Sequence, residues 1–213
     1  MVIAAVITAD IVNSTMLEKA DTRKLTTALS AILKPYKFEF YRGDSFQVYM
    51  PDPKNALKVI LQTRAAAKRL LPESPEPLAD VRASIGIGSV NAPIKSLNTA
   101  TGEAFLLSGK PFDDMNKSEN RLLIQSPNDI VNVGLKITAN YIDLLFSQLT
   151  TKQAAVIFEL LSGYAQIEIS KKFKKSQATI NKHTQAAKWS EINTLLTDYR
   201  LLIDKLWPYQ LYG

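Results

Sequence analysis

The chain has 213 residues, and 46% of them are hydrophobic, which suits one globular domain with a small second unit. It contains no cysteine, so disulfides, thiolate metal sites and a catalytic thiol are excluded, and its single histidine excludes a site built from several histidines. The net charge is +6, and residues 147–213 hold nine Lys and Arg against five Asp and Glu, so the basic charge is concentrated toward the C-terminal end.

The first apolar stretch is too short to cross a membrane or to serve as a signal peptide, because Asp10 interrupts it and no basic leader precedes it. No later apolar run reaches the necessary length either. Together with the absence of cysteine, this pattern favours a cytoplasmic protein with no membrane partner.

Two stretches near the N-terminus each place a carboxylate at the end of a predicted strand. The apolar run at residues 2–7 is typical of a central strand covered on both faces, and Asp10 follows it. Residues 39–50, EFYRGDSFQVYM, alternate as the two strands of a hairpin, with Gly43 in the turn and Asp44 at its tip. If a crossover helix joins the first strand to this hairpin, the first two strands run parallel, and Asp10 and Asp44 lie at the same end of the sheet.

Two converging carboxylates beside a helix N-terminus suit a magnesium or manganese ion that carries a nucleotide triphosphate, because these hard cations take oxygen ligands. The backbone N–H groups at residues 11–14 would then take the phosphates. A turn residue and a strand-end cap are the simpler interpretation of Asp10 and Asp44. Arg42 is either a phosphate ligand or the surface partner of a carboxylate.

The rest of the N-terminal part predicts an α+β domain. Its expected elements after the first strand are a helix started by a capping box at 15–18 and ended by Pro35, the hairpin, a helix at 54–71, a strand at 81–87, a short helix at 102–108 and a strand at 120–125. The β-α-β-β-α-β order is that of a ferredoxin-like or palm sheet. We therefore predict a sheet domain at residues 1–127, followed by a connector helix at 128–148.

Residues 149–213 predict a small all-α domain. Thr150 or Thr151 caps a helix that Gly163 ends, a short helix covers residues 166–173, and Ser176 caps a third helix after a tight turn. This pattern is typical of a helix-turn-helix domain, here followed by a C-terminal amphipathic helix.

The N-terminal part resembles the catalytic domain of class III nucleotidyl cyclases. The resemblance rests on Asp10 with Ile11 after the first strand, on Gly43 with Asp44 in the hairpin, and on VRASIGIGSV at residues 81–90. It implies a cyclase-like domain in which the aspartates hold two metal ions on a nucleotide triphosphate. The implied metal residues are Asp10, Ile11 and Asp44, and the implied nucleotide-phosphate residues are Val12, Asn13, Ser14 and Arg42.

The chain departs from the cyclase pattern where the transition state is stabilised. Aligning Gly102 with the family's Gly-x-x-Val-Asn-x-x-x-Arg helix places Leu106 at the Asn and Lys110 at the Arg. Lys110 is therefore the candidate catalytic residue, and a solvated surface lysine is the simpler interpretation. In its size, its RGDSFQ hairpin and its appended C-terminal module, the whole chain resembles the SatD family of bacterial proteins.

The C-terminal part resembles the helix-turn-helix of LuxR-type regulators and of sigma factor region 4. The matching segments are LTTKQ at 149–153, ELLSG at 159–163 and EISKKFKKSQATINKH at 168–183. The resemblance implies DNA binding, with a homodimer expected from both parent families. The implied DNA-binding residues are Ser176, which caps the recognition helix, Gln177, Thr179, Asn181, Lys182 and His183 at the major groove, and Lys171, Lys172, Lys174 and Lys175 at backbone phosphates.

These observations leave three hypotheses. The first is a cytosolic DNA-binding regulatory protein whose cyclase-like domain, catalytically degenerate, senses a nucleotide or metal or mediates dimerisation. The second is an active nucleotidyl cyclase or related phosphotransferase that uses Asp10 and Asp44 for metal binding and Lys110 at the transition state. The third is a non-enzymatic scaffold, in which the lysine cluster at 171–175 is only a solvated face.

Overall fold

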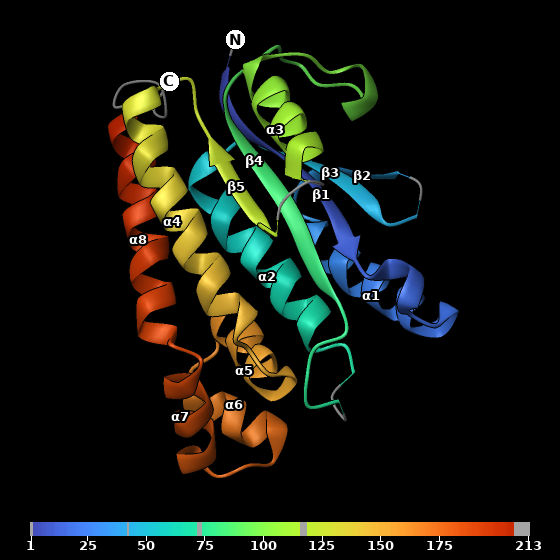
Figure 1. Cartoon of the computed structure of the whole chain (residues 1–213), viewed down its shortest axis with the longest axis vertical. Coiled ribbons are helices and arrows are strands. Elements are labelled where there is room, and N and C mark those ends of the chain that lie inside the picture. Colours follow the sequence, from blue (N-terminus) through green and yellow to red (C-terminus); the bar gives the residue numbers. More distant parts are fainter. Residues whose placement is uncertain (1, 42, 72–73, 116–118, 207–213) are drawn as a thin grey trace.

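The computed structural model describes residues 2–41, 43–71, 74–115 and 119–206. Arg42, a predicted phosphate ligand, lies outside these ranges. Figure 1 shows a five-stranded sheet with helices on both faces and a group of short helices at one end of the molecule. No helix in the described ranges is both long enough and apolar enough to cross a lipid bilayer.

The fold is mixed α/β, and its first six strands and helices follow the order predicted from the sequence. In chain order the elements are β1 (Val2–Val12), η1 (Ser14–Met16), α1 (Lys19–Leu33), β2 (Lys37–Tyr41), β3 (Ser45–Met50), η2 (Pro53–Asn55), α2 (Ala56–Lys68), β4 (Asp80–Val90), η3 (Leu97–Thr99), α3 (Glu103–Asp114), β5 (Leu122–Gln125), α4 (Asp129–Ser147), α5 (Thr151–Leu161), α6 (Gln166–Phe173), α7 (Gln177–Ala186) and α8 (Trp189–Leu206).

Strand β1 forms the centre of the sheet, whose strand order is β2-β3-β1-β4-β5. It is antiparallel to β3 on one side and to β4 on the other, whereas β4 and β5 are parallel. Because β2 is also antiparallel to β3, β1 and β2 run in the same direction, as predicted for two strands joined by a crossover helix. Ile7 and Ala9 pack in the core with α1 and α2, while Ala4 and Val6 pack under α3, which explains why β1 is apolar at successive positions.

Helix α3 lies directly on β4 because β4 has a glycine beneath it. A Cβ atom at Gly86 would come within 2.2 Å of the Ala104 carbonyl oxygen and 2.4 Å of the Ser108 amide nitrogen. Only glycine permits this approach, which also brings the Thr8 hydroxyl to 3.1 Å from the Ser108 hydroxyl. The position of α3 over the sheet is therefore fixed by backbone contact.

The predicted start of the first helix is wrong. β1 continues through Asp10 to Val12, and α1 begins only at Lys19, after the three-residue η1. The N-cap of α1 is Glu18, whose side chain makes no capping hydrogen bond, so the capping box expected at residues 15–18 is absent. The pairing of β1 with the long β4 extends the strand past the end of its apolar run.

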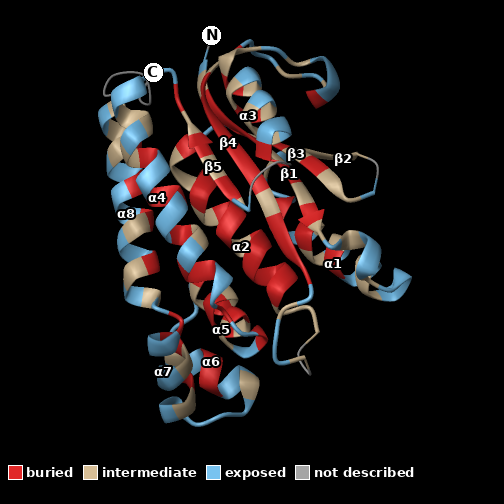
Figure 2. Cartoon of the chain, in the orientation of Figure 1, coloured by how far each residue is buried: buried red, intermediate tan, exposed pale blue. Residues whose placement is uncertain are grey.

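Helix α4 contributes to the main core. Leu135, Ala139, Ile142 and Phe146 belong to one apolar cluster that extends from the sheet through α2 and α5 to Tyr199 on α8. Figure 2 shows this buried interior as a continuous red region from β4 across α2. The cluster continues across the domain boundaries predicted at residues 127 and 148.

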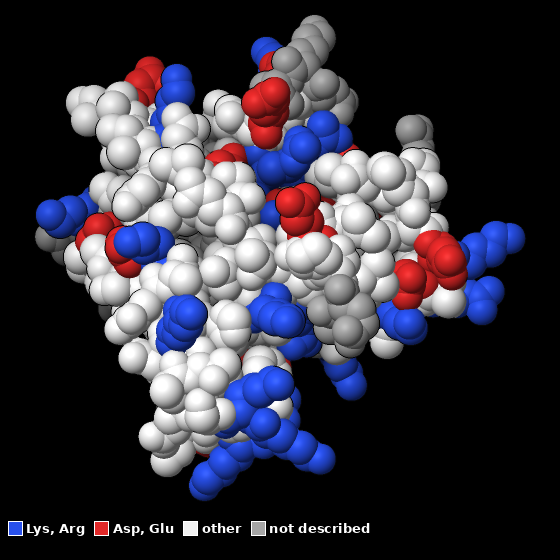
Figure 3. Space-filling model, turned by 60° about the horizontal axis from the view of Figure 1, so that its bottom comes forward, with Lys and Arg blue, Asp and Glu red and all other residues white. Residues whose placement is uncertain are grey.

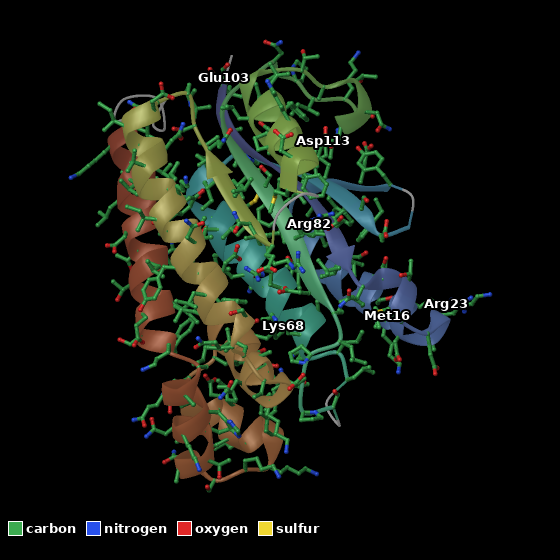
Figure 4. The ribbon with its side chains drawn as sticks, in the orientation of Figure 1. Met16, Arg23, Lys68, Arg82, Glu103 and Asp113 are labelled. Atoms are coloured by element: carbon green, nitrogen blue, oxygen red, sulfur yellow. The ribbon has the colours of Figure 1, made fainter. Side chains whose placement is uncertain are left out.

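A buried arginine links α2 to β4 and α4. Arg64 is 1% exposed, and its Nε and Nη2 atoms donate to the Asp80 carboxylate at 3.1 and 2.9 Å, while Nη1 donates to Asp143 at 2.5 Å. Lys68, labelled in Figure 4, lies 3.3 Å from Asp80. The second oxygen of Asp143 accepts hydrogen bonds from the backbone N–H groups that begin β5. Burial opposes ionisation of Asp80, but the charge and hydrogen bonds of Arg64 outweigh it and lower the pKa of this carboxyl.

We predict that Arg64→Met lowers the free energy of unfolding by about 3–5 kcal/mol, because it leaves two carboxylates without their buried cation. Urea unfolding near neutral pH measures the loss. The contribution of Asp80 is present above its unfolded-state pKa and is lost as the pH falls through the lowered folded-state value, so the difference between the variant and the wild type should shrink in acid.

The matched control is Lys24→Ala, which removes an exposed ion pair with Asp21 and should change stability by less than about 1 kcal/mol. Equal losses in Arg64→Met and in the control would contradict the structural role of Arg64.

Candidate functional site

The structure brings the two predicted aspartates together at one end of the sheet. Asp10 lies in β1 directly opposite Ser45 of β3, and the Ile11 amide donates a hydrogen bond to the Asp44 carbonyl oxygen at 3.0 Å. The parallel direction of β1 and β2 produces this proximity, since it puts the exit of β1 beside the hairpin. We call Asp10, Asp44 and the segment from Ile11 to Ser14 the strand-end site.

Each aspartate of the strand-end site has its own partner. Arg82 of β4, labelled in Figure 4, is the cross-strand neighbour of Asp10. Its guanidinium binds both carboxylate oxygens of Asp10, because Nε donates to Oδ1 at 3.1 Å and Nη2 donates to Oδ2. The Arg82 guanidinium also lies 5.3 Å from the ring centre of Phe112 on α3. The Asp44 Oδ2 atom accepts a hydrogen bond from the Ser14 hydroxyl at 2.7 Å.

This arrangement does not fit a divalent cation shared by Asp10 and Asp44. A magnesium or manganese ion needs free carboxylate oxygens, but both oxygens of Asp10 bind a guanidinium that already neutralises its charge. The two side chains of this pair are 15% and 19% exposed, so water screens their attraction only in part. Within the described residues, no group of three or more acidic or histidine side chains is placed to hold a metal.

The backbone N–H groups of residues 11–14, predicted to bind phosphates, do not lie at the start of the first α-helix as expected. Ile11 and Val12 belong to β1, and the Ile11 amide is used by Asp44. Asn13 has a left-handed backbone with φ of 61°, and its side-chain amide donates to the Leu78 carbonyl oxygen at 3.1 Å. Because β1 continues to Val12 and α1 starts at Lys19, residues 11–14 do not form the N-terminus of an α-helix, and Ser14 begins only the three-residue η1.

Lys110, the candidate catalytic residue, faces a different part of the surface. It lines a hollow between α3 and β5 together with Asp114, Leu123 and Gln125. No described contact links Lys110 to Asp10 or to Asp44. The cation beside Asp10 is Arg82. The alternation of the predicted strand puts Arg82 on its polar side but does not predict that it pairs with Asp10.

A second hollow lies on the α3 face of the sheet, next to the strand-end site. Uncharged polar side chains form much of its lining, among them Thr8, Tyr41, Gln47 and Asn98, with Phe105 beside them. The Gln47 amide donates to the Thr8 hydroxyl at 3.3 Å. Burial and the hydrogen bond to Glu39 raise the pKa of Tyr41 to about 12, so its hydroxyl stays protonated and donates to Glu39 at 3.1 Å.

Helices α5, α6 and α7, which we call the helical unit, form the end of the molecule at the bottom of Figure 1. Val156, Ile169 and Ile180, one from each helix, form their shared apolar cluster. Lys174 ends α6 in a left-handed conformation with φ of 52°, and the Ser176 hydroxyl caps α7 by accepting from the Thr179 amide at 3.1 Å. The predicted bounds of α6 and the Ser176 cap are confirmed, whereas the third helix, which the sequence pattern predicts at residues 177–188, ends at Ala186.

The outer surface of the helical unit is polar and basic. Gln177, Asn181 and Lys182 are exposed on α7, whereas Thr179 and His183 are half-buried. Lys171, Lys174 and Lys175 are exposed around the turn, and no ion pair within the described residues involves them. Figure 3, in which this end comes forward, shows Lys and Arg side chains gathered on it. Burial, followed by the charges of Lys152 and Lys182, lowers the pKa of His183, so this side chain is neutral near pH 7.

Lys172, predicted as a phosphate contact, has a structural partner instead. Its Nζ atom lies 2.7 Å from Glu159 Oε2, and Arg69 at the end of α2 donates to Glu159 Oε1 at 3.0 Å. Glu159 is 1% exposed, and sequence reasoning missed it because it lies inside the apolar pattern of α5. This buried carboxylate joins α5 to α6 within the helical unit. It also joins α5 to α2 of the sheet part, by which we mean strands β1–β5 with helices α1–α3.

Part of this chain is similar to solved structures of bacterial adenylyl cyclases. No family model matches the chain, and a search of curated proteins finds no match. Among solved structures, a bacterial light-regulated adenylyl cyclase matches with 14% identity and a TM-score of 0.40, covering 58% of this chain and 75% of the other. A second structure of a bacterial light-regulated adenylyl cyclase matches with 16% identity and a TM-score of 0.39, covering 64% of this chain and 44% of the other. With TM-scores below 0.5, neither match bears on what this chain does.

We predict that Arg82→Gln destabilises the protein by about 2 kcal/mol, because it leaves the charged Asp10 without its hydrogen-bonding cation. Adding Asp10→Asn to this variant removes the uncompensated charge and should restore part of the loss. Urea unfolding of both single variants and of the double variant measures the coupling. Strictly additive losses would contradict the pairing.

Magnesium or manganese should leave the melting temperature of the wild-type protein unchanged, since Arg82 occupies the oxygens that an ion would need. An ion bound at 100 times its dissociation constant would instead stabilise the fold by about 2.7 kcal/mol. Thermal unfolding with and without each ion measures the difference. A stabilisation that Asp44→Asn abolishes would contradict our interpretation of the site.

Proposed function

We propose that this chain is a DNA-binding regulatory protein in which the helical unit is a helix-turn-helix and α7 is its recognition helix. The observation that carries the proposal is the outer face of α7, which presents Gln177, Asn181 and Lys182 to solvent beside three exposed lysines of the α6–α7 turn. The cluster of Val156, Ile169 and Ile180 holds this face rigid from behind.

The exposed residues of α7 are of the types that read base edges in the major groove. Asn and Gln pair with adenine through two hydrogen bonds, and Lys donates to guanine. Thr179 shares a hydrogen bond with the capping hydroxyl of Ser176, and the neutral His183 is half-buried, so both would act at the margin of the contact. Lys171, Lys174 and Lys175 would neutralise backbone phosphates, and Lys172 would contribute less because Glu159 already pairs with it.

For the sheet part, we propose a ferredoxin-like, cyclase-like domain that has lost catalysis. Support comes from the Arg82 guanidinium at Asp10 and from the separate position of Lys110. Because Arg82 occupies both oxygens of Asp10, this proposal includes no magnesium or manganese ion at the strand-end site, and nucleotide binding stays a prediction. Incubation with ATP or GTP and manganese should give no cyclic nucleotide, and product that disappears in Asp44→Ala would instead favour an active cyclase.

Fluorescence anisotropy with duplex DNA of random sequence tests DNA binding most simply. The wild-type chain should bind at low salt, with an affinity that falls as salt rises. A variant with Lys171, Lys174 and Lys175 replaced by Ala should bind more weakly, and its salt slope should fall by about 0.9 for each phosphate that the variant no longer neutralises.

The matched control replaces Lys19, Lys24 and Lys34 by Ala, an equal change of charge on exposed positions of α1 or beside its end. This control should bind DNA nearly as well as the wild type. Absence of wild-type binding at low salt, or equal losses in the two triple variants, would contradict the proposal.

A further inference from the structure

Helix α4 carries a row of large apolar side chains that no described residue covers. Ile130, Val133, Ile137, Tyr141 and Leu144 are between 42% and 85% exposed. Their spacing of three, four, four and three residues puts them on one side of the helix. We call these five residues the α4 stripe.

The opposite side of α4 is apolar as well. Leu135, Ala139 and Ile142 are fully buried against the sheet part. A helix that is apolar on both sides is typical of a buried helix. The outer side of α4 therefore has the composition of an interior surface, although only its inner side is covered by described residues.

We propose that the α4 stripe is covered by a second copy of this chain, with the two α4 helices packed against each other across a two-fold axis. The spacing of the stripe averages 3.5 residues over four steps, which keeps its side chains in line along the helix, and such a line can pack against its own copy across a two-fold axis. Asp129 and Lys136 are the only charged residues on the exposed side of α4. This side therefore lacks the basic patch that binding to a nucleic acid or to an acidic lipid surface would require.

The size of the surface is consistent with a dimer. The 19 residues of α4 span about 28 Å. Helix α8 lies beside α4 along the same side of the molecule in Figure 1, and its Leu201, 53% exposed, extends the apolar surface. Two adjacent helices, each about 10 Å wide, give a face of about 560 Å², at the low end of specific interfaces, as in a dimer that forms in a concentration-dependent equilibrium.

Whether the two α4 helices run parallel or antiparallel is inferred from the proposed function. The rest of the dimer proposal does not depend on that function. The C-terminal end of α4 leads into the helical unit. If the two copies of α4 run parallel, both helical units lie at the same end of the dimer, where both copies of α7 can reach one duplex. An antiparallel pair would place them at opposite ends.

Sedimentation velocity without DNA tests the interface independently of DNA binding. The wild-type protein should sediment as a dimer, with twice the 23.7 kDa mass of one chain, in a monomer–dimer equilibrium that depends on concentration. Ile137→Glu should weaken the dimer at least about 30-fold, the equivalent of the ~2 kcal/mol of a hot-spot residue. Leu106→Glu, at an equally exposed apolar position on α3, is the control and should leave the dimer unchanged.

Single cysteines test the direction, because the chain has none of its own. Ile130 and Leu144 lie at opposite ends of the α4 stripe, about 21 Å apart. In a parallel pair each faces its own copy, so Ile130→Cys and Leu144→Cys should each form a disulfide-linked dimer on mild oxidation. Crosslinking only in a mixture of the two variants would overturn the parallel arrangement.

The outcomes separate the interface from the proposed function. A chain that stays monomeric, or a dimer that survives Ile137→Glu, would overturn the interface even if the chain binds DNA, and would assign the stripe to another occupant. A dimer that dissociates in Ile137→Glu but does not bind DNA would support the interface and contradict only the DNA-binding proposal.

Discussion

One buried carboxylate that needs two cations holds the helical unit against the sheet part. Glu159 of α5 is almost fully buried, and it is paired with Arg69 at the end of α2 and with Lys172 of α6. Burying a charge costs free energy unless the charge is paired and hydrogen-bonded. Separating α5 from α2 would therefore leave the Glu159 carboxylate without Arg69. Arg69 also lies 3.5 Å from the ring centre of Phe158, which adds to the attachment. The orientation of α7 is thus set by α2, whose Arg64 is itself fixed to β4 and α4.

The same requirement for pairing explains the strand-end site. Asp10 lies within the central strand, and the long β4 places Arg82 directly beside it. The sequence predicted a metal ion at Asp10, and in the structure the Arg82 guanidinium donates to both oxygens of this carboxylate. Lys172 pairs with Glu159 within the fold, whereas Lys171, Lys174 and Lys175 are exposed and form no ion pair with any described residue.

Features set by local sequence were predicted well, and features set by strand register or by distant contacts were not. The alternation around Gly43 and the apolar run before Asp10 gave the hairpin, the central strand and the proximity of Asp10 to Asp44. The capping box was wrong because Ser14–Met16 form the short helix η1 and the chain is extended again at Leu17, so α1 begins only at Lys19. Arg82 was missed because its partner Asp10 lies 72 residues away in the sequence, where no local pattern reports it. Glu159 was missed because it lies inside the apolar pattern of α5, and one of its two partners, Arg69, lies 90 residues away.

Hydrogen exchange of the full chain with and without duplex DNA at low salt tests the central claim most directly, because it locates the bound surface without any substitution. Our account predicts slower exchange in α6 and α7, residues 166–186, and no change at the strand-end site around Asp10 and Asp44. Protection confined to the ends of β1 and β3, with α7 unaffected by DNA, would contradict it.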